Sequence, residues 1–323
     1  MLRLRRLARK ALSSWDLQDA DLHFLFHGEN TTFRVDFGAD RFMMRLARPN
    51  YHTPGQLDSE RLWLQSLCAD GFGVPSPAPH RGGFRLPLSL PGVPERQILL
   101  FRWVDGRFAW KPNRQSLRRT GRLLALLHDH ARRFAFGPDF DRGDWNADTL
   151  LTEENGRFRS WRHADLDNAM RSFLGEFNAA LSESLRPYEA AGPRWLLHAD
   201  LHRANVLHER GTANAIDFDD CGFAHPAVDI AVAMGWVGSD SYDDHWRHLC
   251  AGYAEVTADL PFTREQVYLQ HLARELQMIG WLADRGRDIP AFAAKAPKLA
   301  KRCLPYFRDW LQTGATSSCA GGG

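Results

Sequence analysis

The sequence predicts an α+β protein of two lobes, with a small antiparallel sheet in the first and mainly helices in the second. Short runs rich in β-branched and aromatic residues follow one another near the start, and stripes of apolar residues at helical spacing fill most of the chain after residue 114. Between these stripes, residues 195–219 combine short apolar runs with clustered Asp, Asn and His. The predicted divisions are a first lobe, a helical second lobe and a disordered polar tail, at residues 1–101, 102–312 and 313–323.

The first lobe is expected to contain three consecutive strands joined by turns that hold glycine. These strands are predicted at residues 22–26, 32–37 and 41–46. A helix is predicted over residues 53–69, because Thr53 is typical of a cap and Pro54 suits a first helical turn. The run QILLFRW at residues 97–103 predicts a buried strand that leads to the crossover between the lobes.

The second lobe is expected to be built from amphipathic helices. In residues 114–131, Leu117, Leu124 and Leu127 recur at helical spacing, which indicates one buried face. Further helices are predicted at residues 168–191, at 224–236 and across much of 240–312. The length of 323 residues is enough for two lobes that each have a core.

Composition argues against several classes of protein. The net charge is only +2, which gives no strong field toward nucleic acid or a membrane surface. No apolar run approaches the ~18 residues that a membrane span needs. The five cysteines form no C-x-x-C pair, which favours reduced thiols over a disulfide framework. We therefore expect a cytoplasmic monomer or homodimer that has no nucleic-acid or membrane partner.

One motif carries chemistry. His198, Asp200 and Asn205 stand in the order H-x-D-x-x-x-x-N, and Asp217 follows after a short apolar run. Protein-kinase catalytic loops have this spacing, with an Asp that accepts the hydroxyl proton, an Asn that binds metal, and a later Asp that holds Mg²⁺. We therefore predict that Asp200 orients or deprotonates the acceptor, and that Asn205 and Asp217 bind Mg²⁺. The alternative is that these are loop polar residues that cap turns.

Three segments carry a resemblance to a known family. HADLHRANVL, IDFDD and HPAVDIA, which begin at residues 198, 216 and 225, closely resemble the motifs of aminoglycoside phosphotransferase-like kinases. That family has a protein-kinase-like fold, and it includes aminoglycoside kinases, choline kinases, type II homoserine kinases and a bacterial stress-response Ser/Thr kinase. By the order of its motifs the resemblance covers residues 20–280. Ala199 departs from it, because the family usually has Gly there, and Ala is strained wherever φ is positive.

The resemblance also implies a site for ATP. The lysine that usually holds the phosphates aligns with Arg45, whose planar fork can bind phosphate bidentately. Glu60 aligns with the acid that pairs with this cation. The alternatives are a strand arginine that faces solvent and a solvated helix glutamate.

Further residues are expected around the nucleotide and the loop. Gly28 and Asn30 lie in the turn expected over the phosphates, and Phe101 and Trp103 lie in the strand expected against adenine. Three more residues are expected to support the loop and the metal: His198, Asp219 and Asp229. We expect His198 to brace the loop, and Asp229 to support it from behind by binding His198 or loop N–H groups. Asp219 is expected either to assist the metal or to cap a turn.

The sequence therefore predicts a phosphotransferase that uses ATP and Mg²⁺. It would move the γ-phosphoryl group to a hydroxyl of a small molecule, with a homoserine-, choline- or aminoglycoside-like acceptor. One alternative is a Ser/Thr protein kinase of the bacterial stress-response type. A second alternative is a catalytically silent nucleotide-binding module, which Arg45 suggests because it replaces the usual lysine.

Overall fold

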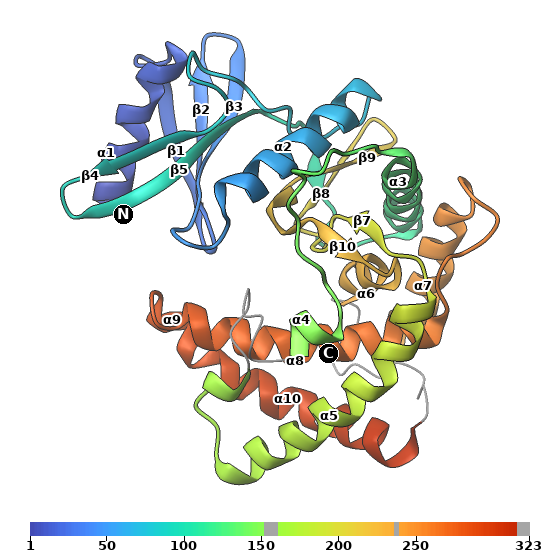
Figure 1. Ribbon diagram of the computed structural model, residues 1–323. Helices are drawn as coiled ribbons and strands as arrows, with labels where there is room; N and C mark the ends of the chain where they lie inside the picture. Colours follow the sequence, from blue (N-terminus) through green and yellow to red (C-terminus); the bar gives the residue numbers. More distant parts are fainter. Residues whose placement is uncertain (152–160, 236–238, 315–323) are drawn as a thin grey trace. The chain divides into compact units, whose positions relative to one another are not determined.

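Figure 1 shows the protein as a computed structural model in which the chain forms two compact units. The structure describes residues 1–151, 161–235 and 239–314. The first unit contains residues 1–106 with two later segments, 134–142 and 214–219, and the second contains the remaining described chain. The first carries a five-stranded antiparallel sheet and the second is largely helical, so the predicted α+β class is confirmed. The lobe boundaries predicted from the sequence stay predictions.

The sheet of the first unit has the strand order β1-β2-β3-β5-β4, and all neighbouring pairs are antiparallel. Its strands are β1 (Asp21–His27), β2 (Thr31–Phe37), β3 (Asp40–Leu46), β4 (Leu86–Leu90) and β5 (Val93–Arg102). Along β2, Thr31, Phe33 and Val35 are buried, because alternate side chains of a strand point to the same face. The three consecutive strands lie within one residue of their predicted ends.

Helix α1 (Leu2–Ala11) and the short helix η1 (Leu12–Trp15) pack on this sheet (Figure 1). α1 buries Leu7 and Ala8 against the strands, whereas its arginines are exposed. Together with Phe33 and Met44, these residues belong to the apolar core of the first unit. Burial of one stripe of an amphipathic helix stabilises the sheet that it covers.

Helix α2 (Pro54–Ala69) begins at Thr53 with a capping box. Thr53 Oγ1 accepts a hydrogen bond from Gln56 N at 3.1 Å, and Gln56 Oε1 accepts one from Thr53 N at 3.1 Å. Leu57, Glu60 and Leu64 are buried, and their spacing places them on one face of the helix. The cap and this apolar face therefore direct a single carboxylate into the interior of the first unit.

The second unit consists mainly of helices. Its helices are α3 (Arg114–Arg133), α4 (Ala147–Leu151), η2 (Trp161–His163), α5 (Asn168–Ala191), α6 (Ala227–Met234), α7 (Ser239–Tyr253), α8 (Arg264–Arg285), α9 (Pro290–Ala293) and α10 (Lys295–Thr313). α5, α8 and α10 share one apolar core, in which Phe177 stacks on Phe307 with ring centroids 4.0 Å apart. The predicted tail begins where α10 ends, and its residues 315–323 lie outside the described residues.

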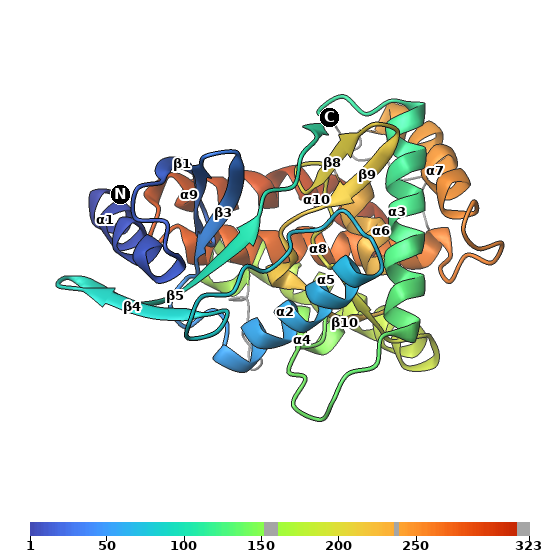
Figure 2. The same cartoon turned by 90° about the horizontal axis from the view of Figure 1, so that it is seen from above.

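Helices α3 and α7 pack side by side in the second unit (Figure 2). A Cβ atom on Gly121 of α3 would lie 1.9 Å from Leu249 O of α7. A Cβ atom on Gly252 of α7 would lie 1.9 Å from Arg118 O of α3. Glycine at both contacts therefore lets the two backbones approach more closely than any side chain would allow.

Short strands of the second unit position the loop at residues 198–205. β7 (Trp195–Leu197) precedes this loop and pairs antiparallel with β10 (Gly222–Ala224), while β8 (Val206–Glu209) follows it and pairs with β6 (Arg107–Phe108). β9 (Thr212–Ala215) continues from β8 and leads to the 3₁₀ helix η3 (Phe218–Asp220). The loop is therefore anchored by a strand pair at each of its ends.

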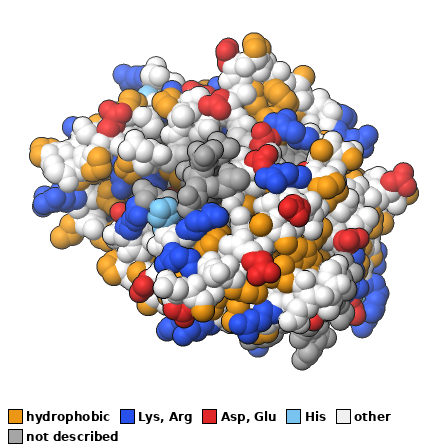
Figure 3. Space-filling model, turned by 60° about the horizontal axis from the view of Figure 1, so that its bottom comes forward, with side chains coloured by type: hydrophobic (Ala, Val, Ile, Leu, Met, Phe, Trp, Pro, Cys, Tyr) orange, Lys and Arg blue, Asp and Glu red, His pale blue; other side chains and the backbone are white. Residues whose placement is uncertain are grey.

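The charges on the surface and the apolar content of the described helices agree with what the composition indicates. On the face drawn in Figure 3, basic and acidic side chains are interspersed, in keeping with a net charge of +2. Among the described helices, none combines the length and the apolar character that crossing a bilayer requires.

Candidate active site

The backbone of the loop at residues 198–205 is held from behind by Asp229. This side chain is fully buried in the first turn of α6. Its Oδ1 accepts a hydrogen bond from Ala199 N at 2.7 Å, and its Oδ2 accepts one from His198 N at 3.3 Å. A buried carboxylate needs such partners, and two backbone N–H groups of the loop supply them. Asp229 thereby fixes the direction in which the chain enters the loop.

A histidine that lies outside the predicted site residues, His128, completes this support. His128 Nε2 lies 3.1 Å from Asp229 Oδ2, and His128 Nδ1 lies 2.8 Å from Tyr253 Oη. His198, by contrast, uses its ring within the loop, where Nδ1 accepts a hydrogen bond from Asp200 N at 3.3 Å. The signal for His128 was available, because it is a polar residue within the buried stripe of α3.

Ala199 carries backbone strain. Its φ is 64°, a left-handed conformation that costs an L-residue about 1–2 kcal/mol. We expect Ala199→Gly to raise the free energy of unfolding by about 0.5–1 kcal/mol, since the relief exceeds the extra chain entropy of glycine. Denaturant unfolding measures this change. Ala215→Gly is the matched control in a buried strand position and should be destabilising; an equal loss in both variants would contradict the prediction.

Asp200 and Asn205 are in contact within the loop. Asn205 Nδ2 donates to Asp200 O at 2.9 Å and to Asp200 Oδ2 at 3.3 Å. In the described part of the chain, Asn205 Oδ1 has no hydrogen-bond partner, although the residue is only 6% exposed. The amide is therefore oriented with its oxygen available, and amide and carboxylate oxygens are the ligands that Mg²⁺ takes in proteins. The residues present fit the predicted metal.

Arg274, which is also outside the predicted site residues, contacts Asp200. Arg274 of α8 donates from Nη2 to Asp200 Oδ1 and from Nη1 to Gln277 Oε1, the latter at 2.9 Å. His202 Nε2 lies 3.6 Å from Asp200 Oδ2, and burial, reinforced by Arg274, lowers the pKa of His202 to about 4. At neutral pH the cation beside Asp200 is therefore the arginine and not the imidazole. The only sequence signal was an arginine between the apolar positions of α8.

In the first unit, Arg45 of β3 and Glu60 of α2 form a buried ion pair. Arg45 Nη1 donates to Glu60 Oε1 at 2.9 Å and Nη2 donates to Oε2 at 2.5 Å, and each residue is 1% exposed. Burial alone would lower the pKa of Arg45, but Glu60, with Asp219 and Asp217, outweighs it and raises this pKa. Among the described residues, Arg45 Nε is buried without a hydrogen-bond partner, and a contact of this N–H with a phosphate oxygen stays a prediction.

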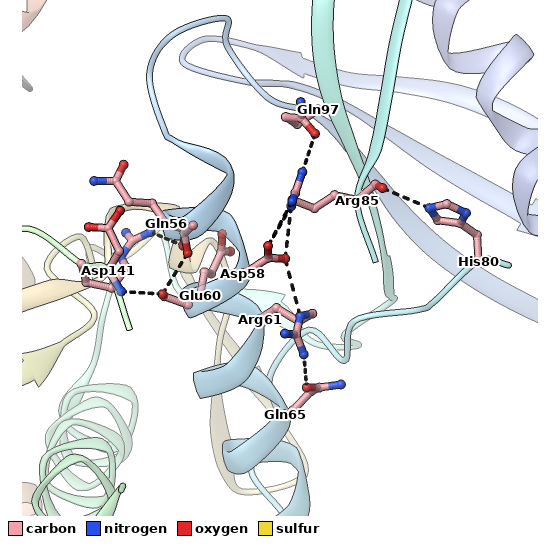
Figure 4. A network of polar contacts seen from close by, with 12 residues as sticks. Gln56, Asp58, Glu60, Arg61, Gln65, His80, Arg85, Gln97 and Asp141 are labelled. Carbon is pink, nitrogen blue, oxygen red and sulfur yellow. Dashed lines mark hydrogen bonds and ion pairs between the residues drawn. The ribbon is translucent and has the colours of Figure 1, made fainter. Parts of the chain in front are cut away.

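Polar contacts on both sides of α2 fix the direction of Glu60 (Figure 4). The Arg85 guanidinium donates to Asp58 in three contacts of 3.1 Å and to Gln97 Oε1 at 2.9 Å. Toward the other side, Asp141 N donates to Ser59 Oγ at 2.8 Å. Asp58 and Ser59 directly precede Glu60 in α2, so the helix cannot turn about its axis without breaking these contacts. The carboxylate is thereby held toward Arg45.

The segment that contains Asp217 and Asp219 also belongs to the first unit. Asp217 has a φ of 68°, an uncommon conformation that clusters at functional sites. Asp219 is 6% exposed, and its Oδ2 accepts a hydrogen bond from Asn30 Nδ2 at 2.5 Å. Asn30 therefore links the predicted phosphate turn to the segment predicted to hold metal, a contact that sequence spacing does not reveal.

The remaining predicted nucleotide residues also lie in the first unit. Gly28 N donates to Asn30 O at 3.0 Å within the turn, and a Cβ atom on Gly28 would lie 2.4 Å from the Phe26 ring. Phe101 is 2% exposed and packs under Arg45, whose Cζ is 5.1 Å from the ring centroid. Trp103 N donates to Arg41 O at 3.0 Å. Phe101 therefore supports Arg45, and contacts of either residue with adenine stay predictions.

The structure brings the predicted residues together in two groups. Arg45, Glu60, Asn30 and Asp219 lie in the first unit with Asp217. The second unit holds the other group, which consists of His198, Asp200, Asn205 and Asp229. Convergence of the two groups around one cation stays a prediction.

Comparison with known proteins decides the family. A model described as the phosphotransferase enzyme family matches residues 26–265, which is most of the chain. The chain belongs to this phosphotransferase family. The resemblance inferred from the sequence motifs is therefore confirmed, and so is the prediction of an enzyme of the transferase class, a kinase.

Solved structures and curated proteins resemble this phosphotransferase over most of its length. The structure of a microcompartment-associated aminopropanol kinase has a TM-score of 0.77 and 27% identity, and covers 94% of this chain and 98% of that one. Amicoumacin kinase hAmiN, solved with AMP-PNP, Ca²⁺ and Ami, has a TM-score of 0.71 and 16% identity, and covers 92% of this chain and 96% of that one. A homoserine kinase of Zymomonas mobilis is 24% identical over 233 residues, or 70% of this chain and 68% of its own. The predicted kinase-like fold is thereby confirmed.

Proposed function

We propose that this phosphotransferase moves the γ-phosphoryl group of ATP, with Mg²⁺, to a hydroxyl of a small amino alcohol. The observation that carries the proposal is the geometry of the loop that Asp229 holds. In this loop Asp200 contacts Asn205 Nδ2, and Asn205 Oδ1 stays available as a metal ligand. ATP as the donor is supported by the buried Arg45–Glu60 pair and its unpaired Nε. A kinase for aminopropanol and a kinase for homoserine among the similar proteins favour an amino alcohol as the acceptor.

Each residue has one task in the proposed reaction. Arg45, directed by Glu60, would hold ATP phosphates, and Gly28 would lie in the turn that covers them. Asn205 and Asp217 would hold the Mg²⁺ ion, which neutralises charge on the phosphates when it is bound. Asp200 would orient the acceptor hydroxyl and take its proton.

A coupled assay of ADP release tests the proposal. The purified protein is incubated with ATP and Mg²⁺ and with 1-amino-2-propanol, L-homoserine, choline or kanamycin. We expect ADP release to rise at least ~10-fold above the acceptor-free rate with one of the amino alcohols, and to stop when EDTA removes the metal. A phosphorylated product seen by mass spectrometry confirms transfer.

Two outcomes would contradict the proposal. Phosphate transferred from labelled ATP to casein or to the protein itself, without transfer to any small acceptor, would favour a protein kinase. A melting shift with ATP but no turnover with any acceptor would favour a silent nucleotide-binding module.

A further inference from the structure

Arg274 contacts the proposed catalytic carboxylate of Asp200 but has no task in the reaction described above. It lies in the middle of α8, 74 residues after Asp200 in the chain, yet its guanidinium donates directly to Asp200 Oδ1. The side chain is 21% exposed, so this is a partly buried ion pair and not a solvated one. Partly buried, hydrogen-bonded pairs hold their geometry better than surface pairs do.

The guanidinium is held by two further groups. Nη1 donates to Gln277 Oε1 at 2.9 Å, and Gln277 is only 4% exposed. Cζ lies 5.8 Å from the ring centroid of Trp145, which is 2% exposed. Trp145 is itself fixed, because its Nε1 donates to Asp220 O at 2.8 Å. A carboxylate, an amide and an indole therefore constrain one planar cation.

We propose that Arg274 is a positioning residue for phosphoryl transfer, which holds the Asp200 carboxylate in the direction that the acceptor hydroxyl requires. The inference rests on the proposed function, because it assigns Arg274 a part in the same reaction. Asn205 Nδ2 already contacts Oδ2 of this carboxylate, so Arg274 on Oδ1 fixes the second oxygen and hence the plane of the group.

The chemistry explains why direction matters. The acceptor oxygen forms a bond to the γ-phosphorus while the bond to the β,γ-bridging oxygen breaks. The electron pair leaves on ADP, and the acceptor proton passes to Asp200. The attacking oxygen must lie in line at about 3 Å, and an error of about 1 Å can cost ~10²-fold in rate. Arginine suits this task better than lysine, because its fork fixes an orientation and not only a charge.

Variants of Arg274 test the proposal by steady-state kinetics with ATP and the amino alcohol that gives the highest rate of ADP release in the coupled assay. We expect Arg274→Gln to lower kcat about 30–100-fold, with KM for ATP changed less than ~3-fold, since Arg274 acts through Asp200. Arg274→Lys should recover part of kcat, and added guanidinium at millimolar concentration should partly rescue Arg274→Ala.

Arg264→Gln is the matched control. Arg264 lies on the same helix, its Nη2 pairs with Asp243 Oδ1 at 2.5 Å, and its Cζ lies 5.2 Å from the ring centroid of Tyr242. This variant also removes an arginine from a carboxylate and an aromatic ring, but away from the loop. It should leave kcat within ~2-fold of the parent protein.

Thermal unfolding tests the pair without any turnover. In a double-mutant cycle with Asp200→Asn, the loss of melting temperature caused by Arg274→Gln should shrink to less than half. If the two substitutions lower the melting temperature additively, Arg274 and Asp200 do not interact, and the proposal is wrong. Unchanged kcat with a raised acceptor KM would overturn the positioning role and assign Arg274 to acceptor binding. If the parent protein releases no ADP with any acceptor, the proposed function fails, and a non-additive cycle then assigns Arg274 to stabilising the loop alone.

Discussion

Asp200→Ala should lower kcat at least ~10²-fold and leave ATP affinity near that of the parent protein. The change removes the carboxylate that Arg274 and Asn205 contact, whereas the buried Arg45–Glu60 pair keeps its geometry. Loss of rate without loss of nucleotide binding is therefore the expected signature of a residue that acts on the acceptor. Steady-state kinetics and calorimetric titration with a non-hydrolysable ATP analogue measure the two quantities.

Two controls belong to this prediction. Asp200→Asn keeps the shape of the side chain and should lose nearly as much kcat, because an amide cannot accept the hydroxyl proton. Asp243→Ala removes an exposed carboxylate that pairs with Arg264 and should have little effect. Parent-like turnover in Asp200→Ala would remove this residue from the mechanism.

Arg45→Met should cause the largest loss of stability, about 3–5 kcal/mol in the free energy of unfolding. Glu60 is 1% exposed and would lose both of its guanidinium contacts, which leaves a buried carboxylate without its cation. KM for ATP should also rise at least ~10-fold, since charge-assisted hydrogen bonds to phosphate are lost. Denaturant unfolding and kinetics check the two effects separately.

The double variant Arg45→Met/Glu60→Leu distinguishes lost pairing from lost packing. Replacement of a whole buried ion pair by apolar residues is often neutral, so the double variant should recover most of the stability but none of the ATP affinity. Arg45→Lys should keep part of both, because lysine retains the charge but not the planar fork. A double variant less stable than Arg45→Met would contradict this account.

Much of the fold follows from local sequence patterns. β-Branched and aromatic residues between turn signals predicted β2 as residues 32–37, and the observed strand is Thr31–Phe37. Helix α5 spans Asn168–Ala191, the range predicted for it, and it begins at Asn168 because the side chain of Asp167 caps its first turn. Such signals lie within a few residues of the structure that they specify, so they can be read without knowledge of the tertiary fold.

Contacts between distant segments were not predictable in this way. His128 and Asp229 are 101 residues apart in the chain, and Asn30 and Asp219 are 189 apart. Nothing in the pattern near Arg274 indicates which carboxylate it meets, because its partner depends on how α8 packs beside the loop. Motif spacing thus predicted which residues carry the chemistry, and that assignment stays a prediction. The residues that contact them became visible only in three dimensions.

The close pairing of α3 and α7 has a consequence for how sequence change is tolerated. Tyr253 stands next to Gly252, and His128 lies two turns after Gly121, so the spacing of the two backbones sets whether this tyrosine and this histidine meet. Through Asp229 that meeting extends to the loop. An exchange of either glycine for alanine, which looks conservative in an alignment, would therefore push the two helices apart and shift the support of the loop at residues 198–205.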